Sequence, residues 1–146
     1  MSKILVVDDE PSVLAMVRMV LELEGHDVQT VENGSDALAA MEQEAPDLLL
    51  LDVMMPGLSG FEVAEEMRSI DGCEELPLIF LSAKAERDDI WTGWKLGADS
   101  YLTKPFDTDE LLDEVSRVLN IRSAPRNEGA RRPQVDRLVV LGEATT

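Results

Sequence analysis

The sequence predicts an α/β fold in which helices cover both faces of a doubly wound, five-stranded parallel sheet. Five short apolar runs alternate along the chain with five longer segments of helical periodicity, a pattern typical of parallel strands joined by crossover helices. Three of these runs, ILVV, LLLL and LIFL, are apolar throughout. Because strands that are buried on both faces have no polar side, these runs indicate a sheet with helices on each face.

The strands come from the apolar runs, which span residues 3–7, 27–31, 47–51, 77–81 and 100–102. The helices come from the segments in which apolar residues recur at helical spacing, about 11–24, 34–45, 59–70, 86–96 and 107–120. Pro11 suits the first turn of the first helix, and Asp107 with Glu110 forms a candidate capping pair for the last. Glycines stand where helices should end, at Gly25, Gly72 and Gly97.

The chain is 45% hydrophobic, which is enough for one substantial core. At least one of Trp91 and Trp94 should pack inward. The helical methionines are also expected to fill the core: Met16, Met19, Met41 and Met67.

The chain is strongly acidic, with a formal net charge of −17. Such a charge repels nucleic acid and anionic membranes, so neither is an expected partner of this segment. The single cysteine, Cys73, excludes an internal disulfide and a cysteine-based metal cluster. Without a signal peptide or a long apolar run, the sequence is typical of a cytoplasmic protein.

Charge also marks a domain boundary near residue 121. Residues 1–120 carry 8 Lys and Arg against 27 Asp and Glu, whereas residues 121–146 carry 5 Arg against 3 acids. We therefore expect one domain at 1–121 and a linker or tail at 122–146. The tail is either the end of a stand-alone protein or a lead into an output domain, and the apolar restart at 138–141 favours the second interpretation.

Polar residues follow the strands at one edge of the predicted sheet. Right-handed crossovers bring the carboxyl ends of parallel strands to that edge, where ligands bind. Three carboxylates, a hydroxyl and an ammonium should therefore converge there, from Asp8, Asp9, Asp52, Ser82 and Lys104. Lys84 also follows the fourth strand.

Three acids in one crevice would raise each other's pKa values unless a divalent cation kept them ionised. Oxygen ligands favour a hard ion such as Mg²⁺, with Mn²⁺ as an alternative. A cation, the Lys104 ammonium and the Ser82 hydroxyl around one carboxylate are what phosphoryl transfer to that carboxylate requires. Asp52, alone after the third strand and followed by the turn-forming Pro56 and Gly57, is the candidate nucleophile.

The motifs VVDDE, LLLLDVMMPGLSG, LIFLSAK and GADSYLTKPF, in this order and spacing, resemble the receiver domain of bacterial response regulators, the CheY-like superfamily. The resemblance covers about residues 2–121. It implies a flavodoxin-like (βα)5 receiver with strand order 2-1-3-4-5. It also implies a signalling switch that assists its own phosphorylation and dephosphorylation and is not a turnover enzyme.

The resemblance implies a role for each residue that matches the family's site. Asp52 would accept a phosphoryl group from a sensor histidine kinase or a phosphotransfer protein. Ser82 and Lys104 would contact that phosphoryl group. The ligands of Mg²⁺ would be Asp8, Asp9, Asp52 and the backbone carbonyl of Met54.

Tyr101 matches the family's aromatic switch position, whose ring turns inward as Ser82 moves toward the phosphoryl group. Phosphorylation adds about −1.5 to −2 charges and should shift a pre-existing equilibrium. The switched face would be built from residues 86–96, 100–102 and 107–120. That face would control an output domain or a downstream protein, and a homodimer through it is a further expectation.

The Lys104–Pro105 peptide bond is expected to be cis.

Two positions are expected to tune how long the phosphoryl group lasts. Met54 and Lys84 each follow a site residue by two positions and, in the family, flank the path of the attacking water. Because the apolar Met54 offers that water no hydrogen bond, we expect slow self-dephosphorylation.

Three other classes compete with the switch. A haloacid-dehalogenase-type phosphatase needs a second Asp two residues after the nucleophile, where this chain has Met54. A flavodoxin-like electron carrier needs a phosphate loop rich in Ser, Thr or Gly after the first strand, and here that loop is acidic. A degenerate receiver that acts only as a docking module is disfavoured because every site residue is present.

Overall fold

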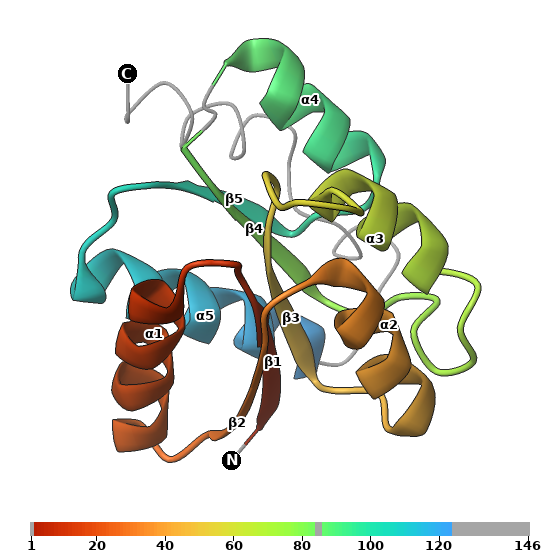
Figure 1. Ribbon diagram of the computed structural model, residues 1–146. Coiled ribbons are helices and arrows are strands. Elements are labelled where there is room, and N and C mark those ends of the chain that lie inside the picture. The colour runs from red at the N-terminus through yellow and green to blue at the C-terminus, as the bar shows by residue number, and fades with distance from the viewer. Residues whose placement is uncertain (1, 84–85, 124–146) are drawn as a thin grey trace.

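The computed structural model describes residues 2–83 and 86–123, which form a single parallel sheet with helices on both faces (Figure 1). The strand order is β2-β1-β3-β4-β5, as the resemblance implied. All four neighbouring pairs are parallel. The strands are β1 (Lys3–Val7), β2 (Asp27–Val31), β3 (Leu48–Asp52), β4 (Leu78–Ser82) and β5 (Ser100–Thr103).

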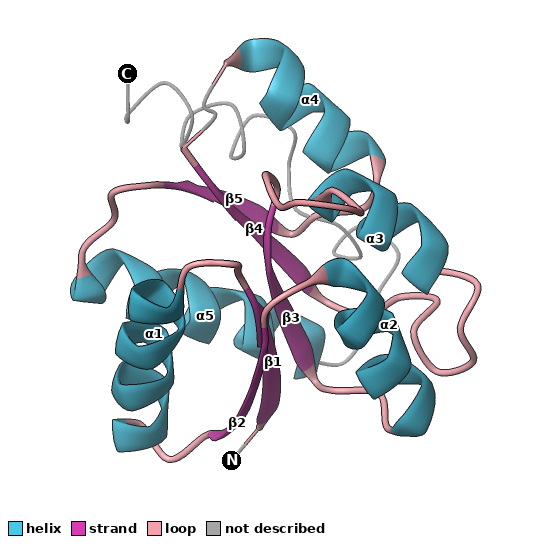
Figure 2. Cartoon of the chain, viewed as in Figure 1, coloured by secondary structure: helices cyan, strands magenta, loops and turns pink. Residues whose placement is uncertain are grey.

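The helices divide between the two faces of the sheet (Figure 2). One face carries the first and last helices, and the other carries the three in between. They are α1 (Pro11–Leu23), α2 (Gly34–Gln43), α3 (Gly60–Met67), α4 (Arg87–Lys95) and α5 (Thr108–Ser123). No helix in the described ranges is both long and apolar enough to cross a bilayer.

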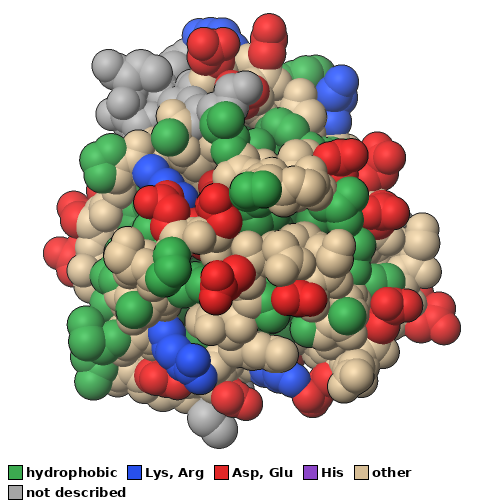
Figure 3. Space-filling view, viewed as in Figure 1, with side chains coloured by type: hydrophobic (Ala, Val, Ile, Leu, Met, Phe, Trp, Pro, Cys, Tyr) green, Lys and Arg blue, Asp and Glu red, His purple; other side chains and the backbone are tan. Residues whose placement is uncertain are grey.

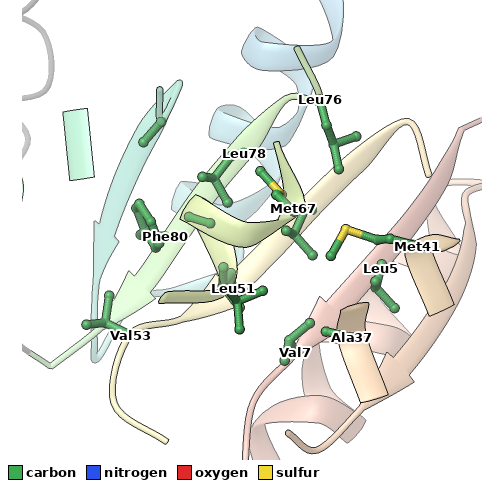
Figure 4. Packing of buried hydrophobic residues seen from close by; sticks show 14 of the residues in the cluster. Leu5, Val7, Ala37, Met41, Leu51, Val53, Met67, Leu76, Leu78 and Phe80 are labelled. Atoms are coloured by element: carbon green, nitrogen blue, oxygen red, sulfur yellow. The ribbon is translucent and has the colours of Figure 1, made fainter. Parts of the chain in front are cut away.

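The sheet separates two hydrophobic clusters, because successive side chains of a strand point to opposite faces. In β3, Leu49 and Leu51 lie in the cluster under α2, α3 and α4, whereas Leu48 and Leu50 lie in the cluster under α1 and α5. Figure 4 shows the first cluster, in which Met41 and Met67 meet Leu5 and Leu78. All four leucines of β3 are fully buried, which confirms the expectation drawn from the LLLL run.

The helix ends confirm the signals read from the sequence. The backbone N–H of Glu110 donates to Asp107, and the N–H of Asp107 donates to Glu110, so these residues form a capping box at the start of α5. Ser59 and Glu62 form a second capping box before α3, which the sequence analysis did not identify. The three glycines expected at helix ends have positive φ angles: 92° at Gly25, 91° at Gly72 and 89° at Gly97.

One methionine departs from the expectation for the core. Met41 and Met67 are buried and Met16 packs partly against the second cluster, but Met19 is 58% exposed. Met19 falls on the outer side of α1, so its prediction as a core residue was wrong. Trp94 packs partly against the first cluster while Trp91 is 47% exposed, so one of the two tryptophans packs inward as expected.

Strands β3 and β4 each end one residue later than the sequence predicted. β3 runs one residue further and ends at Asp52, and β4 likewise ends at Ser82. The two side chains are therefore fixed by the sheet itself, not by the loops after it. Lys84 and residues 124–146 lie outside the described residues.

Candidate functional site

Four strands deliver the predicted side chains to the carboxyl edge of the sheet. Asp8 follows β1, Asp52 and Ser82 end β3 and β4, and Lys104 follows β5. Asp8 and Ser82 are fully buried, and Asp52 is 3% exposed. The structure thus brings together residues that are up to 96 positions apart in the sequence.

The three acidic residues predicted to bind a cation form one cluster. Asp8, Asp9 and Asp52 each offer a carboxylate oxygen, and these oxygens lie within 4.8 Å of one another. Burial and then the charge of Asp8 raise the pKa of Asp52 to about 7, with a smaller contribution from Asp9. The Lys104 charge and a hydrogen bond from the backbone N–H of Met54 oppose this rise.

Lys104 lies against the acidic cluster. Its Nζ is 2.7 Å from Oδ2 of Asp8, 3.1 Å from Oε1 of Glu10 and 3.6 Å from Oδ1 of Asp52. Burial alone would lower the pKa of Lys104, but the hydrogen bond to Asp8 and the charges of Asp52 and Asp8 raise it. Lys104 therefore stays an ammonium and supplies a fixed positive charge beside Asp52. The Lys104–Pro105 bond is cis, as expected.

The backbone around Asp52 is held by a close approach between the start of α3 and the end of β3. The N–H of Gly60 donates to the Val53 carbonyl over 2.8 Å. A Cβ at position 60 would lie 2.2 Å from the carbonyl oxygen of Asp52 and 2.8 Å from Cα of Val53. Both distances are too short for any residue with a side chain to fit there without moving the backbone. Gly60 is therefore required for α3 to begin directly behind the candidate nucleophile.

Ser82 and Tyr101 lie together on the face of the sheet that α4 covers. Their side chains share a hydrogen bond, and Tyr101 is 1% exposed. Burial raises the pKa of Tyr101 to about 12, so the phenol keeps its proton. The ring is packed inward, which is the orientation that the resemblance associates with a switched receiver.

Helix α4 packs closely over the rings of Tyr101 and Phe80. A Cβ at Gly93 would lie 3.0 Å from the Phe80 ring and 3.1 Å from the Tyr101 ring. A shift of the Tyr101 ring toward α4 would therefore press on the helix at Gly93.

Two polar residues beside the site were not assigned from the sequence. Glu10 contacts Lys104, a contact that the sequence motifs did not predict. Thr103 is paired in register with Ser82, and its buried hydroxyl has no hydrogen-bond partner among the described residues. The position of Thr103 directly before Lys104 in the sequence could have marked Thr103 as a residue near the site. Only the strand register shows that Thr103 lies beside Ser82. Met54 is 58% exposed, and Lys84 cannot be placed because it is outside the described residues.

The donor set fits a hard divalent cation. All the clustered ligands are carboxylate oxygens, which Mg²⁺ prefers. Burial first, and then the charge of Asp8, raise the pKa of Asp52 even with Lys104 alongside, so a cation bound there would favour the ionised form of Asp52.

Comparison with known proteins decides the family. The family model described as "Response regulator receiver domain" matches residues 4–116. The chain is a response regulator receiver domain. Receiver domains are signalling domains of two-component systems. The face of this receiver in Figure 3 carries acidic side chains in scattered groups, with fewer Lys and Arg side chains among them.

The relatives of this receiver include proteins of two sizes. It is 40% identical to the alkaline phosphatase synthesis transcriptional regulatory protein PhoP of Bacillus subtilis, over 97% of this chain and 58% of PhoP. It is also 40% identical to the protein PilH of Pseudomonas aeruginosa, over 82% of this chain and 98% of PilH. The receiver therefore spans little more than half of PhoP but nearly all of PilH.

Solved structures share the fold of this receiver. The chemotaxis protein CheY4 of Vibrio cholerae has a TM-score of 0.78 at 33% identity, and the match covers 81% of this chain and 98% of CheY4. The receiver domain of the sensor histidine kinase PA1611 of Pseudomonas aeruginosa has a TM-score of 0.75 at 29% identity, covering 82% of this chain and 98% of that one. That structure has a magnesium ion coordinated in its active-site cleft.

Proposed function

We propose that Asp52 accepts a phosphoryl group from the phosphohistidine of a sensor kinase or phosphotransfer protein, and that the receiver switches as a result. The observation that carries this proposal is the position of Asp52. Its carboxylate lies in one cluster with those of Asp8 and Asp9, and the Lys104 ammonium is 3.6 Å away. A buried carboxylate that lies beside both ligands for a cation and a fixed positive charge is suited to attack a phosphorus atom.

The transfer needs little chemistry from the protein beyond positioning and charge. An oxygen of Asp52 attacks the phosphorus, and the bond between phosphorus and the donor nitrogen breaks as the new P–O bond forms. The donor imidazole leaves with the electron pair and takes up a proton. Lys104 and the Ser82 hydroxyl, at the ends of neighbouring strands, would donate to the phosphoryl oxygens.

Asp8, Asp9, Asp52 and the Met54 carbonyl would hold Mg²⁺, with Mn²⁺ as an alternative. When bound, the cation would offset the charge of the phosphoryl oxygens and keep the carboxylates ionised. The burial of Asp8 and Asp52 supports this assignment because buried carboxylates are retained where they are paired or coordinate a metal. The backbone N–H of Met54 already donates to Asp52, which orients that carboxylate from the protein side.

The switch would run from Asp52 through Ser82 and Tyr101 to α4. Ser82 has two competing partners, the Tyr101 phenol and a new phosphoryl group. If Ser82 turns toward the phosphoryl group, its hydrogen bond to Tyr101 is lost and the contact between Tyr101 and Gly93 of α4 changes. The moving surface would be the face formed by α4, β5 and α5.

Buried and partly buried hydrogen bonds hold α5 against β5 and the residue before it within that face. Glu114 accepts from the Ser100 hydroxyl over 2.7 Å and from Arg117 over 2.8 Å, and Arg117 also donates to the Asp99 carbonyl. The carboxylate of Glu114 is therefore turned inward, so it does not oppose a partner across the face. Contact with an output domain, a downstream protein or a second copy is compatible with this arrangement.

We also propose a domain boundary, a partner and a type of chemistry for this chain. Residues 1–121 would form the receiver and 122–146 a linker toward an output domain. The end of the family match at residue 116 supports this division, and the match to PhoP over 145 residues supports a chain that continues past the receiver in that relative. The partner would be a kinase in the cytoplasm. Phosphorylation and its reversal would be the chemistry of the chain, with no turnover of a separate substrate.

The test is intact-mass measurement after incubation with acetyl phosphate and Mg²⁺. The wild type should gain one phosphoryl group that is lost in base, and Asp52→Asn should gain none. Asp71→Asn, which removes an exposed acid away from the site, should behave as the wild type. Equal behaviour of wild type and Asp52→Asn would overturn the proposal.

A further inference from the structure

Glu10, the acidic residue that directly follows Asp8 and Asp9, contacts the side chain of Lys104. Oε1 of Glu10 lies 3.1 Å from Nζ of Lys104, which is closer than the 3.6 Å between that nitrogen and Asp52. We propose that Glu10 is a positioning residue that holds the Lys104 ammonium back from Asp52 and so slows phosphorylation. This inference rests on the proposed role of Asp52 as phosphoacceptor.

The backbone of Glu10 is fixed independently of its side chain. Its N–H donates to Oδ1 of Asp8 over 2.9 Å, and its carbonyl accepts from the N–H groups of Val13 and Leu14 in the first turn of α1. Glu10 occupies the N-cap position of α1, but its side chain makes no capping hydrogen bond. The side chain reaches Lys104 instead, so a neutral isostere at position 10 should change the contact with Lys104 without moving the chain.

Competition for Lys104 follows from its three contacts. The ammonium is divided among Asp8, Glu10 and Asp52, and Asp52 has the longest distance. If Asp8 serves a cation, Glu10 is the carboxylate that remains to compete with the phosphoryl group at Asp52. Lys104 must then leave Glu10, or share its protons with it, before it can donate fully to the new phosphoryl oxygens.

The solvent exposure of the Glu10 and Lys104 side chains limits how much their contact can change the rate of phosphorylation. The side chain of Glu10 is 58% exposed and that of Lys104 is 15% exposed, so water screens the contact. Exposed ion pairs of this kind change equilibria and rates by about two- to fivefold. Salt should weaken this contribution further, because the Debye length falls to about 3 Å at 1 M ionic strength.

The experiment compares the rate of phosphorylation by acetyl phosphate in Glu10→Gln and in the wild type, both saturated with Mg²⁺. We expect Glu10→Gln to be about two- to fivefold faster at low salt and to converge with the wild type at 1 M salt. Glu32→Gln is the matched control, because Glu32 is an exposed acid that follows β2 at the same sheet edge. An equal acceleration in Glu32→Gln would mean that Glu10 only repels the anionic donor, which overturns the inference.

A double-mutant cycle with Lys104→Met tests whether the effect passes through Lys104. The acceleration by Glu10→Gln should disappear in the Lys104→Met background. Calorimetric titration with Mg²⁺ gives a second measurement, since a loss of affinity of about tenfold or more in Glu10→Gln would make Glu10 a metal ligand instead. An unchanged rate in Glu10→Gln overturns this inference alone, whereas absence of any adduct in the wild type overturns both it and the proposed function.

Discussion

The ammonium of Lys104 lies 3.6 Å from Oδ1 of Asp52, although two helices, α3 and α4, and two strands, β4 and β5, separate the two residues in the sequence. The same ammonium is 2.7 Å from Asp8, whose side chain is completely buried. Lys104 therefore contacts both the candidate phosphoacceptor and the innermost acid. Its charge stabilises the site before any phosphoryl group arrives.

Replacement of Lys104 by Met should destabilise the metal-free protein by about 1–3 kcal/mol, because Asp8 loses its charged partner while still buried. Mg²⁺ should restore part of the loss, since a cation can take over the charge. Urea unfolding with and without Mg²⁺ measures both effects. Lys95→Met, at an exposed position on α4, should change the free energy of unfolding by less than about 0.5 kcal/mol. Equal effects at the two positions would contradict the role given to Lys104.

The raised pKa of Asp52 predicts a pH dependence of stability. Its pKa of about 7 lies above the ordinary value of 3.8, so between these values the folded state binds more protons than the unfolded state. The contribution of Asp52 to stability must therefore fall as pH rises from about 4 to 7. Asp52→Asn should stabilise the metal-free protein more at pH 8 than at pH 5.

Thermal unfolding of wild type and Asp52→Asn across this range, in the presence of a chelator, checks the sign. Mg²⁺ at pH 8 should raise the wild-type midpoint and reduce the difference between the two proteins. A difference that stayed constant with pH would show that Asp52 has an ordinary pKa.

Tryptophan fluorescence should report the switch, because both tryptophans of the chain lie on α4. The rings of Trp91 and Trp94 lie 5.0 Å apart, and Trp91 is 47% exposed. Phosphorylation should change their emission through the contact between Tyr101 and Gly93. Tyr101→Ala should still form the adduct but show a smaller change. An adduct that forms without any change of emission would contradict a switch through α4.

The exposed side chain of Met54 should prolong the life of the phosphoryl group, because it cannot hydrogen-bond an attacking water. Replacement by Gln would offer one neutral hydrogen bond and should speed the loss of phosphoryl by about fivefold. The decay of the intact-mass adduct after removal of the donor measures this rate. Decay that is no faster in Met54→Gln would remove Met54 from the tuning residues.

The sequence predicted the strands, their burial and the convergence of Asp8, Asp52 and Lys104, because apolar runs and parallel crossovers leave few alternatives for the sheet edge. It did not predict that Glu10 contacts Lys104 or that Thr103 lies beside Ser82. Such contacts depend on rotamers and strand register, which local patterns do not encode. Met19 was misassigned for a related reason: helical spacing marks the apolar positions of α1 but does not say which of them face the sheet.

The most direct test of the account is to identify the residue that carries the phosphoryl group. Borohydride reduction of the adduct formed with acetyl phosphate and Mg²⁺ converts an aspartyl phosphate to homoserine, which peptide mass mapping can locate. The account predicts homoserine at position 52 and at no other aspartate of the site. Homoserine at Asp8 or Asp9, or an adduct that resists reduction, would contradict it.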